Sequence, residues 1–298
     1  MVTLVWMDDS MTGIEEEVAR YYERFRSKFE QWWAADKTLG IHFGYYDKGV
    51  TSHVQSIFAM NDFTWSLLQI PPGASATILD VGCGVGGTSI YLARKHPQAS
   101  FTGIDIVPTQ INLAIRFAEQ WGVSANTKFI VGSYLRTGFP GNYFDGVLAL
   151  ESINYAQDIN TFIQEMYRVL KPGCRLVILD GFRNNKPVNP VLRKLHKMWL
   201  DGNALTDVES LEHLTFCLKN QGFHDITVTD ISEHVKPSAL RLSIISIPFF
   251  FAAVLKILVT LNRLNKAEDY YYFMGVPLLG SFVAVGGLSS YYAVTAIK

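Results

Sequence analysis

The segment Ile78–Thr88 places the strongest constraint on how this chain can fold. An apolar run, Ile78-Leu79-Asp80-Val81, leads into glycines at positions 82, 84, 86 and 87, and a helix-compatible segment follows. Glycine has no Cβ, so the backbone can turn sharply there and another group can approach it closely. A strand that enters a helix through such a turn is typical of α/β domains in which a ligand lies against the turn.

Beyond this segment, short apolar runs alternate with amphipathic ones. The pattern predicts strands at 77–81, 100–106, 127–131, 144–150, 175–180, 223–230 and 290–297. It predicts helices between them at 88–95, 108–121, 159–170 and 207–221. Two more helices are expected before the first strand, at 14–32 and 52–68, the second stopped by Pro71-Pro72-Gly73. Strands that alternate with helices predict a parallel sheet covered on both faces.

Composition excludes several classes of protein. The 298 residues are 49% hydrophobic and carry a formal net charge of -1, which excludes a disordered tail and gives no basic surface for nucleic acid. The three cysteines form no CxxC pair and the histidines show no ligand spacing, so we expect neither disulfides nor a metal site. A reducing cytoplasm is the expected location, because Asp8 and Asp9 stand where a secretory signal would be basic or apolar.

Two stretches near the end of the chain carry no charge, Leu242–Leu255 and Phe273–Ile297. The first is short for a membrane span and contains Pro248, and the second is interrupted by glycines and Pro277. Two interpretations stay open. The segment can form buried lid helices over a pocket, or it can rest on a membrane surface, with contact through 242–261 and a membrane-associated location.

An acidic residue, Asp105, ends the second predicted strand about 20 residues beyond the glycine turn, where a carboxylate can accept hydrogen bonds from a ribose. These features alone fit either a dinucleotide or an adenosyl ligand. The spacing of Asp80, Gly82, Gly84 and Gly86 resembles the first motif of the class I methyltransferases that use S-adenosylmethionine (SAM). The segments 144–151 and 169–176 resemble two later motifs of that family, so the resemblance covers about 76–182.

The resemblance implies a Rossmann-like α/β fold with seven strands, of which six are parallel and the last is antiparallel. It implies one methyltransferase domain over 1–298, with an N-terminal helical cap at 1–70, a SAM-binding core at 71–235, an inserted helical lid at 236–289 and the last strand at 290–298. SAM is then the cofactor. The residues implied to bind it are Tyr22, Asp80, Gly82, Cys83, Gly84, Asp105, Ile106, Gln110, Ser133, Tyr134 and Glu151.

Particular roles follow from the family pattern. Gly82 and Gly84 would line the methionine part of SAM, and Asp105 would hold the ribose. The family commonly has an acidic residue for the adenine after the third strand, and this chain has Ser133 there instead. Ser133 could accept that hydrogen bond through its hydroxyl.

The aromatic loop, defined here as Ile41–Asp47, resembles a segment of tocopherol, sterol and cyclopropane-fatty-acid methyltransferases. Glu151-Ser152 resembles their Glu-Ser turn, and 101–180 looks like O-methyltransferases of mycobacterial lipids. The resemblance implies that Tyr45 closes over SAM. Glu151 could take a proton from an acceptor hydroxyl or stabilise a carbocation, whereas His42 could be a general base or a hydrogen-bonded structural histidine.

These observations predict an enzyme that transfers a methyl group from SAM to carbon or oxygen of a small hydrophobic metabolite such as an isoprenoid, a sterol-like molecule, a quinone or a lipid. Two alternatives stay open. One is methylation of a polar amine or a phospho-headgroup, and the other is a membrane-associated SAM-binding protein without catalysis.

Overall fold

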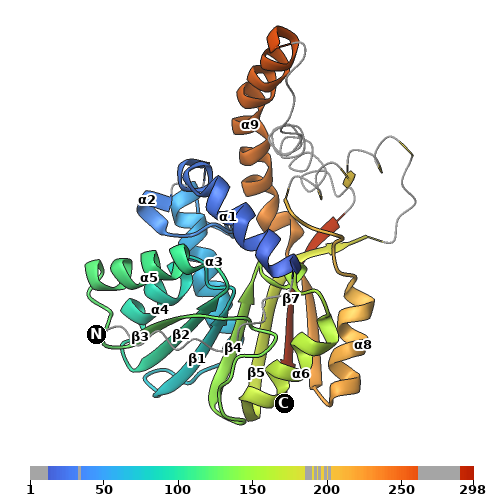
Figure 1. Cartoon of the computed structure of the whole chain (residues 1–298). Coiled ribbons are helices and arrows are strands. Elements are labelled where there is room, and N and C mark those ends of the chain that lie inside the picture. The colour runs from blue at the N-terminus through green and yellow to red at the C-terminus, as the bar shows by residue number, and fades with distance from the viewer. Residues whose placement is uncertain are drawn as a thin grey trace.

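The computed structural model describes residues 13–32, 35–184, 203–260 and 289–298, together with Pro190, Arg193, His196, Lys197 and Leu200. Its centre is a seven-stranded sheet in the order β3-β2-β1-β4-β5-β7-β6 (Figure 1). The strands are β1 (Ala76–Val81), β2 (Ala99–Asp105), β3 (Thr127–Val131), β4 (Phe144–Leu150), β5 (Leu170–Arg183), β6 (His224–Asp230) and β7 (Ser289–Ile297).

Strand β7 differs from the others in direction. It inserts between β5 and β6 and runs antiparallel to both, while the pairs from β3 to β5 are parallel. The predicted sheet of six parallel strands and one antiparallel last strand is therefore confirmed. The insertion brings residues near the end of the chain beside the ends of β4 and β5.

Helices cover both faces of the sheet because neighbouring strand residues are buried on opposite sides. In β1, Ile78 packs with the cluster of α3 (His53–Leu68), α4 (Gly87–Lys95) and α5 (Pro108–Gln120). Leu79 packs with the opposite cluster, which contains α6 (Ile159–Val169) and α8 (Leu211–Gln221). Both side chains are fully buried, so the core occupies both sides of β1.

Helix ends follow local capping chemistry. Helix α3 begins after Ser52, whose hydroxyl accepts from the Gln55 amide in a capping box. Helix α8 begins at Leu211, four residues later than the predicted Asp207, because the Ser210 hydroxyl accepts from the His213 amide and caps the helix there. Helix α6 ends at Val169, shortly before Lys171-Pro172-Gly173, whose proline cannot continue a helix.

Helices α1 (Gly13–Trp32) and α2 (Ala35–Thr38) lie across one end of the sheet (Figure 1). Between β6 and β7 the chain forms α9 (Ser232–Thr260), which projects beyond the body of the fold at that same end (Figure 1). The rest of the predicted insertion, and most of the second uncharged stretch, lie outside the described residues. Among the described helices, we find none with an apolar stretch long enough to cross a bilayer.

Candidate active site

The glycine turn lies between β1 and α4 and uses the conformations that glycine permits. Gly82, Gly84 and Gly86 have φ angles of +70°, +54° and +79°. The Gly82 amide donates to the carbonyl oxygen of Ile104 at 2.8 Å, which holds the turn against β2. A Cβ on Gly82 would lie 2.5 Å from the Cβ of Ser152, so a side chain at this position would collide with the segment after β4.

Asp105, at the end of β2, is fixed against this turn. Its Oδ2 accepts from the Gly84 amide at 2.9 Å, and its Oδ1 accepts from the Val107 amide at 2.9 Å. Burial raises the pKa of Asp105, and these amide bonds oppose that rise because they stabilise the ionised carboxylate. Asp80 lies beside the turn as well and accepts from the Ser89 hydroxyl at 2.7 Å.

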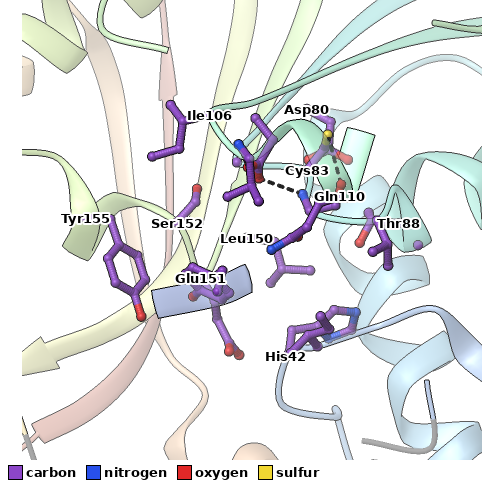
Figure 2. A pocket seen from close by; sticks show the side chains of 18 of the residues that line it. His42, Asp80, Cys83, Thr88, Ile106, Gln110, Leu150, Glu151, Ser152 and Tyr155 are labelled. Atoms are coloured by element: carbon purple, nitrogen blue, oxygen red, sulfur yellow. Dashed lines mark hydrogen bonds between the residues drawn. The ribbon is translucent and has the colours of Figure 1, made fainter. Parts of the chain in front are cut away.

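A cavity extends from the glycine turn to the segments that follow β4. It contains about 1010 Å³ of empty space, counting the part open to solvent. Figure 2 shows Glu151 and His42 on one side of it and Cys83, Gln110 and Asp80 on the other. The predicted site residues that line it are Tyr22, His42, Asp80, Gly82, Cys83, Gly84, Asp105, Ile106, Gln110, Tyr134 and Glu151.

Two predicted site residues lie elsewhere. The ring of Tyr45 is stacked between the rings of Phe63 and His234, with centroid distances of 4.5 Å and 4.4 Å. The hydroxyl of Ser133 accepts from the Leu135 amide at 3.1 Å. Neither side chain belongs to the described lining of the cavity. Their contacts with the cofactor stay predictions.

Glu151 follows β4 directly and has a left-handed backbone with φ of +52°. Its Oε1 accepts from the Phe43 amide at 2.7 Å and from the Tyr291 hydroxyl at 2.8 Å. Burial raises the pKa of Glu151 to about 8, and the charge of Asp180 adds to the rise, while the Phe43 and Tyr291 hydrogen bonds oppose it. A carboxyl with a pKa near neutral pH suits proton transfer.

His42 is almost completely buried in the aromatic loop. Its Nδ1 lies 2.9 Å from the Phe43 carbonyl oxygen, which can only accept, so Nδ1 carries the proton. Its Nε2 is buried, and the side chain of Asn61 interacts with the ring. Burial lowers the pKa of His42 to about 4, so the ring is neutral at physiological pH. Of the two predicted bases, Glu151 has the more suitable pKa.

Sequence reasoning missed several parts of the cavity. Glu15 and Val18 of α1 and Thr88 of α4 line it, whereas only Tyr22 was predicted from α1. Tyr291 also escaped notice, because 140 positions separate it from Glu151 and the packing of β7 alone brings them together. Within the described residues, no three His, Cys, Asp or Glu side chains are grouped as a metal site would require.

Comparisons with known proteins agree with this geometry. Residues 78–173 match the family model described as a methyltransferase domain. Over 237 residues the chain is 30% identical to a probable chloroplastic tocopherol O-methyltransferase of Oryza sativa subsp. japonica, covering 76% of this chain and 64% of that protein. It is 31% identical over 209 residues to norajmaline N-methyltransferase of Rauvolfia serpentina, covering 66% of this chain and 71% of that protein.

A solved structure shares the fold over nearly the whole chain. Geranyl diphosphate C-methyltransferase of Streptomyces coelicolor A3(2) aligns with a TM-score of 0.72 and 17% identity, covering 98% of this chain and 100% of that one. The chain spans less than two thirds of the length of the tocopherol enzyme and 71% of the norajmaline enzyme. This chain belongs to the class I SAM-dependent methyltransferase family.

Proposed function

We propose that the protein transfers a methyl group from SAM to carbon or oxygen of a small hydrophobic metabolite of the isoprenoid, sterol, quinone or lipid type. The observation that carries this proposal is one cavity that the glycine turn, Asp105 and Glu151 line together. Such a cavity can hold a cofactor and an acceptor together. Methyl transfer depends mainly on holding the acceptor atom, the methyl carbon and the sulfur in line and on excluding water.

The residues present fit SAM. Gly82 and Gly84 form a turn with no Cβ atoms, where the backbone can approach the methionine part. Asp105 accepts amide hydrogen bonds from Gly84, Ile106 and Val107 and still has accepting capacity for a ribose hydroxyl. Bound SAM would supply a methyl group on a positively charged sulfonium. Carboxyl groups of Glu15, Asp80, Asp105 and Glu151 lie around the cavity, and those that are ionised favour a cation there.

The same carboxyl groups favour a neutral acceptor. The structural neighbour was crystallised with Mg²⁺ and a thiolodiphosphate, whereas the described residues of this chain group no three His, Cys, Asp or Glu side chains that could hold such an ion. Without a cation, a diphosphate would meet repulsion from every carboxylate of the cavity that is ionised. Apolar and aromatic side chains form much of the wall and suit a hydrophobic molecule with one hydroxyl or one alkene carbon. These side chains are Val18, Tyr22, Leu39, Ile41, Leu150 and Tyr155.

We further propose the domain division expected from the sequence, in which 1–70 caps the core and 236–289 forms a lid before the last strand. Two observations support it. Residues of α1 line the cavity, and the amide of Gly44 donates to the Ser238 hydroxyl of α9 at 3.0 Å. The cap and the start of α9 thus meet beside the cavity. A cytoplasmic location stays a prediction.

Peripheral membrane contact through 242–261 is part of the same proposal. The side chains of Leu240, Ile244, Ile247 and Phe251 recur at helical spacing on α9 and are each between 46% and 64% exposed. No charged residue lies between Arg241 and Lys256. An exposed apolar stripe on a projecting helix suits a lipid surface from which a hydrophobic acceptor can be drawn.

Vesicle flotation tests this contact. We expect the protein to float with phosphatidylcholine–phosphatidylglycerol vesicles and the double variant Ile244→Glu/Phe251→Glu to stay in the soluble fraction. Phe216→Glu is the matched control, since Phe216 is 60% exposed on α8. Equal flotation of the double variant and the wild type would contradict membrane contact through α9.

The methyl-transfer proposal is tested with SAM labelled in its methyl group and an extract of nonpolar metabolites. We expect mass spectrometry to find label in an organic-phase product. The variant Glu151→Gln, which keeps the shape of the side chain, should give much less product while still binding SAM. Label only in aqueous products would refute the hydrophobic acceptor, and SAM binding without any label would refute the transferase activity.

A further inference from the structure

Two hydrogen bonds converge on a single oxygen of Glu151. The Phe43 amide and the Tyr291 hydroxyl both donate to Oε1, at 2.7 Å and 2.8 Å. Within the described chain, neither bond involves Oε2, and Glu151 lines the cavity. The carboxyl group is therefore held by one oxygen, and no hydrogen bond of the described chain occupies the other.

Tyr291 is placed for this contact by the sheet and by α9. Its side chain is only 2% exposed, and its ring lies edge-on to Phe43 with a centroid distance of 6.1 Å. Its hydroxyl also lies 3.5 Å from the Leu179 carbonyl oxygen, to which the Glu151 amide donates at 2.8 Å. Its own amide donates to the Ser232 hydroxyl at the start of α9, at 2.9 Å.

The other donor is anchored to the same helix. Next to Phe43, the Gly44 amide donates to the Ser238 hydroxyl of α9, and the Tyr46 amide donates to the His234 carbonyl oxygen at 2.9 Å. Both donors to Glu151 are thus fastened to the first turns of α9. Hydrogen bonds that fix the donors in this way also fix the rotamer of the Glu151 side chain.

We propose that Tyr291 is a positioning residue for Glu151, and that its hydroxyl, together with the Phe43 amide, holds Oε1 so that Oε2 faces the methyl acceptor. This inference rests on the proposed role of Glu151 in methyl transfer. In that role Oε2 accepts the proton of an acceptor hydroxyl as oxygen bonds to the methyl carbon and the methyl–sulfur bond breaks. The bonding electrons leave with sulfur, which becomes a neutral thioether.

Several titratable groups surround Glu151 and determine its proton affinity. The charge of Asp180 on β5 disfavours the ionised carboxylate, whereas the Tyr291 hydroxyl on β7 favours it. Tyr155, after β4, and His42, in the aromatic loop, line the same cavity. Removal of the Tyr291 hydroxyl alone should therefore raise the pKa of Glu151, because a hydrogen bond to the charged form is lost.

Infrared titration of the unliganded protein tests the proposal. The carboxylic C=O band of Glu151 is identified as the band that disappears in Glu151→Gln. We expect its titration midpoint to rise in Tyr291→Phe by roughly one to two pH units, the shift expected for loss of a hydrogen bond to a charged group. Tyr292→Phe is the matched control, since the ring of Tyr292 packs against Phe182. The titration midpoint of Glu151 in this variant should equal that of the wild type.

A second variant covers the case in which Tyr291→Phe does not fold. A fluorinated tyrosine at position 291 donates a stronger hydrogen bond and should move the midpoint downward. An unchanged midpoint in either Tyr291 variant, or an equal shift in Tyr292→Phe, overturns the proposal. The titration needs no methyl transfer, so failure of the labelling experiment and failure of this inference are separate results.

Discussion

Replacing Gly82 with alanine should damage the site in two separable ways. The residue has a φ of +70°, which costs an L-amino acid free energy in any environment. The new Cβ would also lie 2.5 Å from the Cβ of Ser152, a distance that non-bonded carbon atoms do not tolerate. The glycine turn would have to move away from the segment that carries Glu151.

The magnitude follows from these two contributions. A left-handed alanine costs roughly 1–2 kcal/mol and an overpacked contact roughly 1–3 kcal/mol, so the free energy of unfolding should fall by about 2–5 kcal/mol. Gly122 offers a matched control, because it has the same φ of +70° and no atom within 4 Å of its ideal Cβ position. The free energy of unfolding should therefore fall in Gly122→Ala only by the roughly 1–2 kcal/mol that a left-handed alanine costs.

Urea unfolding and SAM titration calorimetry measure the two effects. We expect Gly82→Ala to be less stable than Gly122→Ala and to bind SAM at least about tenfold more weakly than the wild type, a loss of ~1.4 kcal/mol. Gly122→Ala should bind SAM normally, since it lies outside the cavity lining. If the two variants were equally stable and bound SAM equally well, the close approach of the turn to Ser152 would not matter.

Three further predictions concern the charged and titratable groups. Folding raises the pKa of Glu151 from 4.5 to about 8, so the folded protein keeps a proton that the unfolded chain releases, and wild-type stability should fall between these pH values. The loss of stability as pH rises should be smaller in Glu151→Gln, where only other buried carboxyl groups such as Asp80 and Asp180, with pKa values raised to about 6, still contribute. Urea unfolding of both proteins across that range measures the difference, and the same pH dependence in both would refute this account. Asp105→Ala should lower the free energy of unfolding by roughly 1–3 kcal/mol and weaken SAM binding, because it leaves the Gly84 and Val107 amides without acceptors; unchanged unfolding and calorimetry curves would argue against that role. The His42 ring should titrate near pH 4 in an NMR experiment, and a midpoint near 6.5 would show that the ring is not buried as described.

The position of Tyr45 shows where prediction from sequence stopped. The aromatic loop was recognisable, and it does approach the cavity through Ile41 and His42. Which of its side chains point inward depends on partners from distant elements. The ring of Tyr45 stacks on Phe63 of α3 and His234 of α9, while the Phe43 amide donates a hydrogen bond to Glu151.

The sequence by itself determined the α/β class, the seven strands, the glycine turn and Asp105. These features depend on local periodicity and on backbone conformations that glycine alone tolerates, so they are readable from neighbouring residues. Tertiary structure decided how Glu151 is held, because its partners Phe43 and Tyr291 lie 108 and 140 positions away and meet it only after the sheet is assembled. The pKa values of Glu151 and His42 were likewise set by burial, which a linear pattern does not contain.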